Sequence, residues 1–544
     1  MTDDTTNQGI PEPEGESDII ETDYEIGQDN YEGSVGPIGF DIHNPVFVVS
    51  GATIVLFVFY ALALPEHAST FFGWLRPAVT SSFDWFFFAA ADIFVLFCLF
   101  LIVSPFGRVR LGGVDATPDY SYIGWFAMLF AAGMGIGLMF YGVSEPMSHY
   151  STAFGGIATE DGVRTDWAPL GAAAGDQAAA VRLGMAATIF HWGLHPWAIY
   201  AIVALSLALF TYNKGLPLTI RSAFYPIFGE RVWGWTGHII DTLAVFATLF
   251  GLATSLGFGA TQANAGLNEL FGIPVGSTTE VILITAITAV ALVSVVRGLD
   301  GGVKILSEIN MGLAFVLLIF VLLVGPTMVV LTGFVDSLVA YIEYLPALAN
   351  PFGREDVNFS QGWTAFYWAW WISWSPFVGM FIARVSRGRT VREFVICVLL
   401  IPSLVCVLWM SVFGGTAIQQ VVVDGFTGAQ DAALELKLFK MLGELPLASI
   451  TSFVGIVLVV VFFVTSSDSG SLVIDTITAG GKVDAPVPQR VFWCIFEGAV
   501  AIVLLLGGGL AALQAMVIST GLPFTVVLLL MCWAIYKGLS TEAR

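Results

Sequence analysis

Residues 131–137 read AAGMGIG, and residues 367–377 read YWAWWISWSPF. Each stretch lies inside a long apolar run, where an uninterrupted helix would be expected. The three alternating glycines of the first stretch each weaken a helix by about 1 kcal/mol relative to alanine. The proline of the second stretch, Pro376, removes a backbone donor and clashes with the preceding turn. We therefore expect both membrane spans to be broken near their middle.

The glycine stretch has two interpretations. Gly133 and Gly137 are spaced as a small-residue motif for close packing between helices. Gly135 lies on the opposite face, where packing needs no glycine. The three together favour an unwound segment that a ligand can approach closely.

Tryptophan is concentrated around the second stretch. Five of the sixteen tryptophans lie between residues 363 and 374. The ordinary place for a membrane tryptophan is the interfacial belt, and this explanation fits Trp363. Trp370, Trp371 and Trp374 lie deeper and adjoin the proline. We expect some of them to face a ligand rather than lipid or a neighbouring helix.

The composition places most of the chain in lipid. Apolar and aromatic residues make up 56% of the 544 residues and charged residues 12%, against about 25% charged residues in a soluble domain. The net charge is −21, and without a basic stripe to neutralise phosphates we expect no nucleic-acid partner. The five cysteines lie in apolar runs without metal-type spacing. No nucleophile–base set is visible, so we do not expect an enzyme.

Twelve apolar runs follow an acidic N-terminal segment, and each can cross a bilayer as a helix of about 20 residues. They span residues 45–65, 84–104, 121–142, 183–210, 237–265, 279–296, 306–333, 361–383, 393–417, 447–467, 490–508 and 511–536. With the N-terminus inside, the internal loops hold fifteen Lys and Arg residues and the external loops six. This bias predicts a cell-membrane protein with cytoplasmic N- and C-termini.

Span 8 follows span 3 by five spans, which suggests two units of five spans each. Because five is an odd number, the second unit would enter the membrane with the opposite orientation. Broken helices at matching places in inverted units mark the midplane site of a transporter. The predicted fold is an all-α integral membrane protein of twelve transmembrane helices with a five-plus-five inverted repeat, spans 3–7 and 8–12. The expected segments are a disordered acidic cytoplasmic tail 1–44, two additional helices 45–110, the first repeat 115–335, an external interfacial helix 336–360, the second repeat 361–536 and a short cytoplasmic tail 537–544.

Span 4 contributes Trp192, Trp197 and Tyr200, which together with Trp371 could form an aromatic box. A trimethylammonium group cannot donate a conventional hydrogen bond, so proteins bind it on ring faces, at up to about 2 kcal/mol per contact. Aromatic packing between helices explains span 4 alone equally well. No carboxylate is evident facing the box. A zwitterion would bring its own negative charge, which the exposed amides of the glycine stretch can receive.

A run of hydroxyl side chains ends span 10, where residues 462–469 read FFVTSSDS. Hydroxyl and carbonyl oxygens suit a small hard cation such as Na⁺. Serine and threonine also commonly bond back to their own helix, which is the alternative explanation.

At these residues the chain resembles the betaine/carnitine/choline transporter family. The matching stretches are GMGIGLMFYG at 133–142, HWGLHPWAIY at 191–200, YWAWWISWSPFVG at 367–379, ARVSRGRTVREF at 383–394 and VTSSDSGS at 464–471. The resemblance runs from about the first span to the last. It implies a homotrimer of twelve-helix subunits, each importing glycine betaine or a related quaternary-ammonium solute by Na⁺ symport, without a cofactor.

The resemblance also implies the site residues. The trimethylammonium box would consist of Trp192, Trp197, Tyr200 and Trp371, with Trp374 beside the substrate. One sodium ion would be bound by Ala131, Met134, Phe462, Thr465 and Ser466. The glycine stretch lacks the aspartate that carnitine or choline members often carry, and in this it is similar to sodium-coupled betaine importers.

The chain departs from the family at the second sodium site, which in the family uses two threonines of span 5 and a phenylalanine of span 8. The matching positions are Thr248, Leu252 and Phe377, and Ser255 lies nearby and could compensate. The leucine leaves open whether one or two sodium ions bind. The long basic C-terminal helix of osmosensing members is also missing, so we do not expect osmotic activation of that kind.

The alternative function is sodium-independent exchange of carnitine- or choline-type substrates. Such family members place a fixed positive side chain where the ion would bind. Spans 3, 5 and 10 hold no Lys or Arg, which favours sodium. A channel or receptor is disfavoured by the predicted pair of broken helices.

Overall fold

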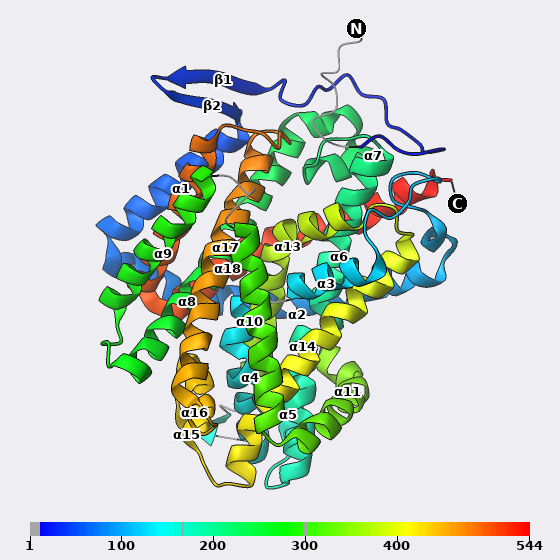
Figure 1. Ribbon diagram of the computed structural model, residues 1–544. Coiled ribbons are helices and arrows are strands. Elements are labelled where there is room, and N and C mark those ends of the chain that lie inside the picture. Colours follow the sequence, from blue (N-terminus) through cyan, green and yellow to red (C-terminus); the bar gives the residue numbers. More distant parts are fainter. Residues whose placement is uncertain (1–10, 134, 158, 165–167, 298–302, 544) are drawn as a thin grey trace.

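The computed structural model describes residues 11–133, 135–157, 159–164, 168–297 and 303–543. Most of this chain is helical, as the apolar runs predict (Figure 1). The long helices are α1 (Val46–Ala63), α2 (Pro65–Val103), α3 (Tyr122–Gly133), α4 (Ile136–Gly155), α5 (Gln177–Trp192), α6 (Leu194–Ala208), α8 (Trp235–Phe271), α9 (Ser277–Arg297), α10 (Val303–Val324), α11 (Thr327–Ala349), α13 (Ala365–Val385), α14 (Val391–Val422), α17 (Ala448–Thr478) and α18 (Val487–Ser540).

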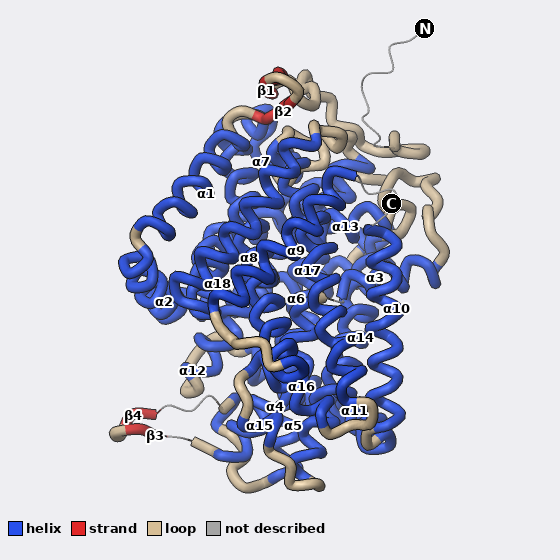
Figure 2. The backbone as a smooth tube through the Cα atoms, turned by 60° about the vertical axis from the view of Figure 1, so that its left-hand side comes forward, coloured by secondary structure: helices blue, strands red, loops and turns tan. Residues whose placement is uncertain are grey.

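Short elements connect these helices at the two ends of the molecule. They are the strands β1 (Asn30–Val35), β2 (Ile38–His43), β3 (Thr159–Glu160) and β4 (Val163–Arg164), and the helices α7 (Tyr225–Phe228), α12 (Val357–Phe359), α15 (Gly428–Asp431) and α16 (Lys437–Gly443). The antiparallel hairpin β1–β2, α7 and the last turn of α18 lie at one end, and α15, α16, β3 and β4 lie at the other (Figures 1 and 2). The first and last described segments therefore lie on the same side of the molecule.

Within the described residues, ten helices are long and apolar enough to cross a bilayer, and the bent pair α3–α4 raises the number to eleven. Helix α18 has 54 residues, more than twice what one crossing needs. Its backbone leaves helical geometry at Gly508 and Gly509. This break falls at the predicted junction between the last two spans. The count of twelve spans and the inverted repeat remain predictions.

The glycine stretch breaks the third span, as predicted. Helix α3 ends at Gly133, α4 begins at Ile136, and their axes differ by 66°. Gly135 between them has an extended backbone, with φ −176° and ψ −172°. Met134 lies outside the described residues. The unwound interpretation of this stretch is therefore confirmed, and the junction lies in the interior of the helix bundle.

The predicted break at Pro376 is wrong, because α13 runs through the proline without interruption. Proline at position 376 leaves the carbonyl of Ile372, four residues earlier, without its helical N–H donor. The hydroxyl of Ser375 donates to this carbonyl at 2.6 Å and replaces the missing bond. The eighth span is thus a continuous helix, and only the third shows the predicted unwinding within the described chain.

The predicted boundary of the seventh span at residue 333 is also wrong. Helix α10 ends at Val324, and α11 begins at Thr327, after Gly325 and Pro326. Proline is well tolerated just before or at a helix start and cannot continue the preceding helix. The predicted interfacial helix 336–360 is therefore the second part of a longer helix, which ends at Ala349 and is itself apolar enough to enter a bilayer.

The prediction that residues 1–44 are disordered is wrong for the hairpin β1–β2. Lys482, in the loop between α17 and α18, forms ion pairs with Glu32 and Asp41 of the two strands at 2.7 and 2.6 Å. The Asn30 side chain donates to the carbonyl of Ala479 at 2.8 Å. These contacts, which connect segments more than 400 residues apart, supply the order that the local composition does not.

Candidate functional site

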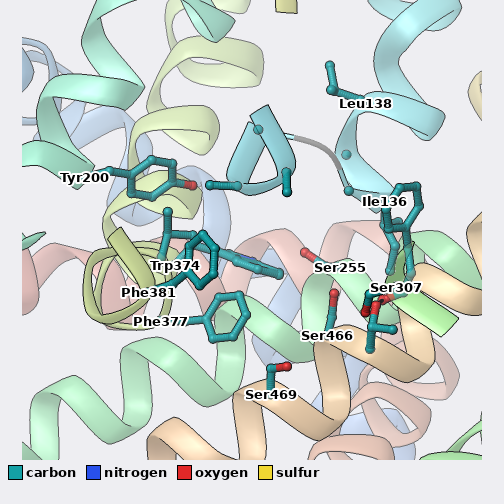
Figure 3. A pocket seen from close by; sticks show the side chains of 18 of the residues that line it. Ile136, Leu138, Tyr200, Ser255, Ser307, Trp374, Phe377, Phe381, Ser466 and Ser469 are labelled. Atoms are coloured by element: carbon teal, nitrogen blue, oxygen red, sulfur yellow. Dashed lines mark hydrogen bonds between the residues drawn. The ribbon is translucent and has the colours of Figure 1, made fainter. Parts of the chain in front are cut away.

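A cavity of about 400 Å³ lies where the α3–α4 junction meets α5, α6, α8, α10, α13 and α17. Most of the predicted site residues line it, namely Ala131, Gly133, Gly135, Gly137, Trp192, Tyr200, Ser255, Trp370, Trp371, Trp374, Phe377, Phe462, Thr465 and Ser466. Figure 3 shows the rings of Tyr200, Trp374 and Phe377 beside the cavity, with the hydroxyls of Ser255 and Ser466 beyond them. Residues from distant parts of the sequence thus border one cavity.

The glycines give the aromatic rings access to the α3–α4 backbone. A Cβ atom added at Gly137 would lie 2.9 Å from Cη2 of Trp192 and 3.0 Å from Cη2 of Trp370. A Cβ added at Gly133 would lie 3.4 Å from Cζ2 of Trp197. A Cβ added at Gly135 would meet no atom within 4 Å. Glycine is therefore needed at position 137 for close packing against two indoles, an added Cβ at Gly133 would make an ordinary contact with Trp197, and Gly135 borders open space in the cavity.

Three of the four rings of the predicted aromatic box, those of Trp192, Tyr200 and Trp371, line the cavity. The ring of Trp371 lies 4.9 Å from Trp192 and 6.1 Å from Tyr200 between centroids, both in edge-on arrangements. Trp197 contacts Tyr200 edge-on at 5.2 Å and stands behind it rather than at the cavity wall. Near-perpendicular rings around a shared space can present several faces to one quaternary ammonium group.

Hydrogen bonds between elements fix each indole of the site. The N–H of Trp371 donates to the carbonyl of His191 at 2.9 Å, and that of Trp374 to the carbonyl of Gly251 at 3.0 Å. The carbonyl of His191 is free for this bond because the helix is interrupted at Gly193, between the end of α5 and the start of α6. A preorganised box loses little conformational entropy when a ligand binds.

Behind the box lies a buried carboxylate, Glu145 of α4, which the sequence analysis did not single out. Its Oε2 accepts from the indole N–H of Trp192 at 2.7 Å and from the hydroxyl of Tyr367 at 2.5 Å. Its Oε1 lies 2.5 Å from Nδ1 of His191 and 3.2 Å from Nε2 of His149. The sequence analysis ended the third span at residue 142, whereas the structure continues it as α4 to Gly155 and so places Glu145 inside it. A carboxylate inside a membrane span is rare and usually functional.

The glutamate and the two histidines offer one ligand atom each within 4.8 Å of one another, a spacing that could hold a metal ion. Both oxygens of Glu145 and both ring nitrogens of His191 already have protein partners, the second nitrogen of His191 being 2.8 Å from the hydroxyl of Thr364. Hydrogen bonding among protein groups therefore accounts for the arrangement.

Four of the five predicted ligands of the first sodium ion border the cavity, and Met134 lies outside the described residues. The hydroxyl of Thr465 donates to the carbonyl of Val461 in the same helix at 3.0 Å. This bond uses the proton of the hydroxyl and leaves the lone pairs of its oxygen available to a cation. Ser466 directs its hydroxyl toward the cavity (Figure 3). Hydroxyl residues of α17 and the last turn of α3 thus border the same cavity.

The predicted residues of the second sodium site are not all brought to the cavity. Ser255 and Phe377 line it, whereas Thr248 is buried in α8 and bonds back to the carbonyl of Ala244 at 2.7 Å. Leu252 is 1% exposed and fills the space beside Gly470 of α17, where any added Cβ would collide with its Cδ1. An apolar side chain therefore occupies the α8–α17 contact.

A cavity partly lined by aromatic rings at a broken helix junction, inside a bundle of apolar helices, is typical of a membrane transporter. Residues 45–544 match the family model of BCCT, the betaine/carnitine/choline family transporters. The chain belongs to this family, and it is a multi-pass membrane protein.

The chain is also similar to named transporters along nearly its whole length. A glycine betaine/proline/choline transporter of Vibrio parahaemolyticus is 68% identical over 538 residues, which cover 99% of this chain and 97% of that protein. Glycine betaine transporter 1 of the same bacterium is 57% identical, covering 97% and 98% of the two chains. A glycine betaine transporter of Bacillus subtilis is 44% identical, covering 92% and 95%.

Proposed function

We propose that this protein imports glycine betaine, or a closely related quaternary-ammonium compatible solute, across the cell membrane by symport with Na⁺. The observation that carries the proposal is the aromatic box around Trp371, at the unwound junction between α3 and α4. Ring faces bind the trimethylammonium group, and the backbone amides of the junction receive the carboxylate. The names of the similar transporters support the same substrate class.

Sodium coupling is supported by the oxygen groups that border the cavity. Thr465 and Ser466 of α17 and the end of α3 at Ala131 would bind the ion together. Among the described lining residues, the one cationic side chain is Arg384, in the last turn of α13. An ion held between α17 and α3 favours the conformation in which the two helices meet, so ion binding biases alternating access.

The proposal includes cytoplasmic N- and C-termini and a homotrimer. The first and last described segments lie at one end of the molecule (Figure 1), and the Lys and Arg bias assigns that end to the cytoplasm. The trimer follows from resemblance to the family. Chemical crosslinking in native membranes would test the oligomeric state, and labelling of cysteines introduced at Gly36 and Gly425 would test the orientation.

The test of function is uptake of radiolabelled glycine betaine into proteoliposomes. Uptake should be saturable, should require external Na⁺, and should fall when proline, choline, ectoine or a sulfonio analogue competes. Replacing Na⁺ by K⁺ or N-methylglucamine should abolish it. Uptake that does not depend on Na⁺ but requires substrate inside the proteoliposomes would instead support sodium-independent exchange.

A further inference from the structure

The four indole N–H groups around the cavity have different acceptors. Those of Trp371 and Trp374 donate to backbone carbonyls, and that of Trp370 donates to the hydroxyl of Ser255. Trp192 donates to the carboxylate of Glu145. Among these four rings, Trp192 is therefore the one coupled directly to a charged group.

The carboxylate of Glu145 is held in its charged form by geometry. It is fully buried, and four N–H or O–H groups converge on its two oxygens. His191 can donate from Nδ1 to Glu145 while its Nε2 accepts from the hydroxyl of Thr364, an assignment that keeps the imidazole neutral. His149 donates in the same way from Nε2. The cluster then carries one net negative charge in an apolar surrounding.

A carboxylate that accepts from an indole N–H pushes electron density into the ring, because hydrogen bonds to charged groups polarise their donors strongly. Trp192 presents this ring to the cavity and lies edge-on to Trp371 at 4.9 Å. A more electron-rich face attracts a cation more strongly. The charge of Glu145 adds a direct attraction that water does not screen in the interior.

We infer that Glu145 is the counter-charge of the aromatic box. Acting through the indole of Trp192, it makes the site prefer a permanently cationic headgroup over a neutral group of the same shape. The inference rests on the proposed function and assigns a selectivity role to a residue that does not border the cavity. His149, His191 and Tyr367 are then positioning residues that keep the carboxylate against the indole.

The test compares two ligands of equal shape. Glycine betaine carries a trimethylammonium group, and 3,3-dimethylbutanoate carries a tert-butyl group in its place. The Kd of each is measured by tryptophan fluorescence and calorimetry on the purified full-length protein. In Glu145→Gln, the ratio of the Kd of 3,3-dimethylbutanoate, the neutral-headgroup isostere, to the Kd of glycine betaine should fall about tenfold or more. The Kd of glycine betaine should rise, and that of the isostere should change least. A residue that only supports the fold would weaken both ligands alike.

Matched tryptophan variants keep the test decisive if Glu145→Gln does not fold. Trp192→Phe and Trp371→Phe each exchange an indole for a phenyl ring in the same box, but the first removes the N–H that Glu145 accepts and the second removes an N–H bound to a neutral carbonyl. Trp192→Phe should lower the ratio several-fold more than Trp371→Phe. In a Trp192→Phe background, Glu145→Gln should have little further effect on the ratio.

Equal ratios in the two phenylalanine variants, or an unchanged ratio in Glu145→Gln, would overturn the inference while leaving the proposed function intact. Failure of the unmodified protein to bind glycine betaine would instead remove the proposed function itself. Ser255→Ala, which frees the indole of Trp370 from a neutral acceptor, should leave the ratio unchanged whatever it does to absolute affinity.

Discussion

The indole N–H of Trp370, on α13, donates to the hydroxyl of Ser255, on α8, with a nitrogen–oxygen distance of 3.1 Å. The same hydroxyl lies 3.4 Å from the carbonyl of Gly251, to which it donates. Ser255 is the residue that could replace the hydroxyl lacking at Leu252. Its oxygen already donates one hydrogen bond and accepts another, so one lone pair is left for a second ion, against two on the hydroxyl of Thr465.

We therefore expect the Hill coefficient for Na⁺ in glycine betaine uptake to be about one. Leu252→Thr should raise it, because a hydroxyl would then stand between Thr248 and the α17 backbone, with Gly470 leaving room for it. The measurement is the initial uptake rate in proteoliposomes across a Na⁺ titration. A coefficient near two in the unmodified protein would show that Ser255 or another group completes a second site.

The proposed first sodium site can be tested with variants of its hydroxyl residues. Thr465→Ala combined with Ser466→Ala should raise the Na⁺ concentration for half-maximal uptake several-fold, since both predicted hydroxyl ligands are lost. The control is Ser519→Ala, which removes a hydroxyl that also bonds back to its own helix, at the carbonyl of Ala515, but lies outside the cavity lining. An unchanged Na⁺ requirement in the double variant would separate these hydroxyls from the ion.

The box predicts a graded loss of affinity at Trp371. Trp371→Ala should raise the apparent Kd for glycine betaine about tenfold or more, because one cation–π contact is worth roughly 1–2 kcal/mol. Trp371→Phe should raise it less, since a ring face is retained. Trp235→Ala, at an exposed position on α8, is the matched control. The Kd for glycine betaine is measured by calorimetry on the purified protein. An unchanged Kd in both Trp371 variants would show that this residue is not part of the site.

A variant of Gly135 can distinguish a role in helix packing from a role in ligand binding. Because an added Cβ meets no atom within 4 Å, Gly135→Leu should fold and insert normally while its side chain fills part of the cavity and abolishes uptake. Gly333→Leu, at another position with open space around the added Cβ, should keep uptake. Surface expression and uptake are measured together, and near-normal uptake by Gly135→Leu would leave the glycine without a role in binding.

The sequence predicted the parts of the site that depend on local patterns. The glycines of the third span and the tryptophans of the eighth are anomalous inside apolar runs, and the cavity contains both sets. The network at Glu145 was missed because its partners His191 and Tyr367 are 46 and 222 residues away. The continuous α13 was missed for a local reason, since the hydroxyl of Ser375 compensates for Pro376. The β1–β2 hairpin depends on Lys482, which no local pattern connects to residues 30–43.

Under the proposed Na⁺ symport, Leu252, whose side chain packs against Gly470, affects how far the cell can concentrate its solute. A zwitterion carries no net charge, so in the proposed symport the driving energy would come from the ions that accompany it. With a tenfold Na⁺ gradient and a potential of 100 mV, each ion supplies about 3.7 kcal/mol. One ion then sustains an accumulation of roughly 500-fold and two ions roughly 200,000-fold. A chain limited to one ion by Leu252 would reach a lower ceiling, but it would spend half as much of the sodium gradient on each molecule taken up.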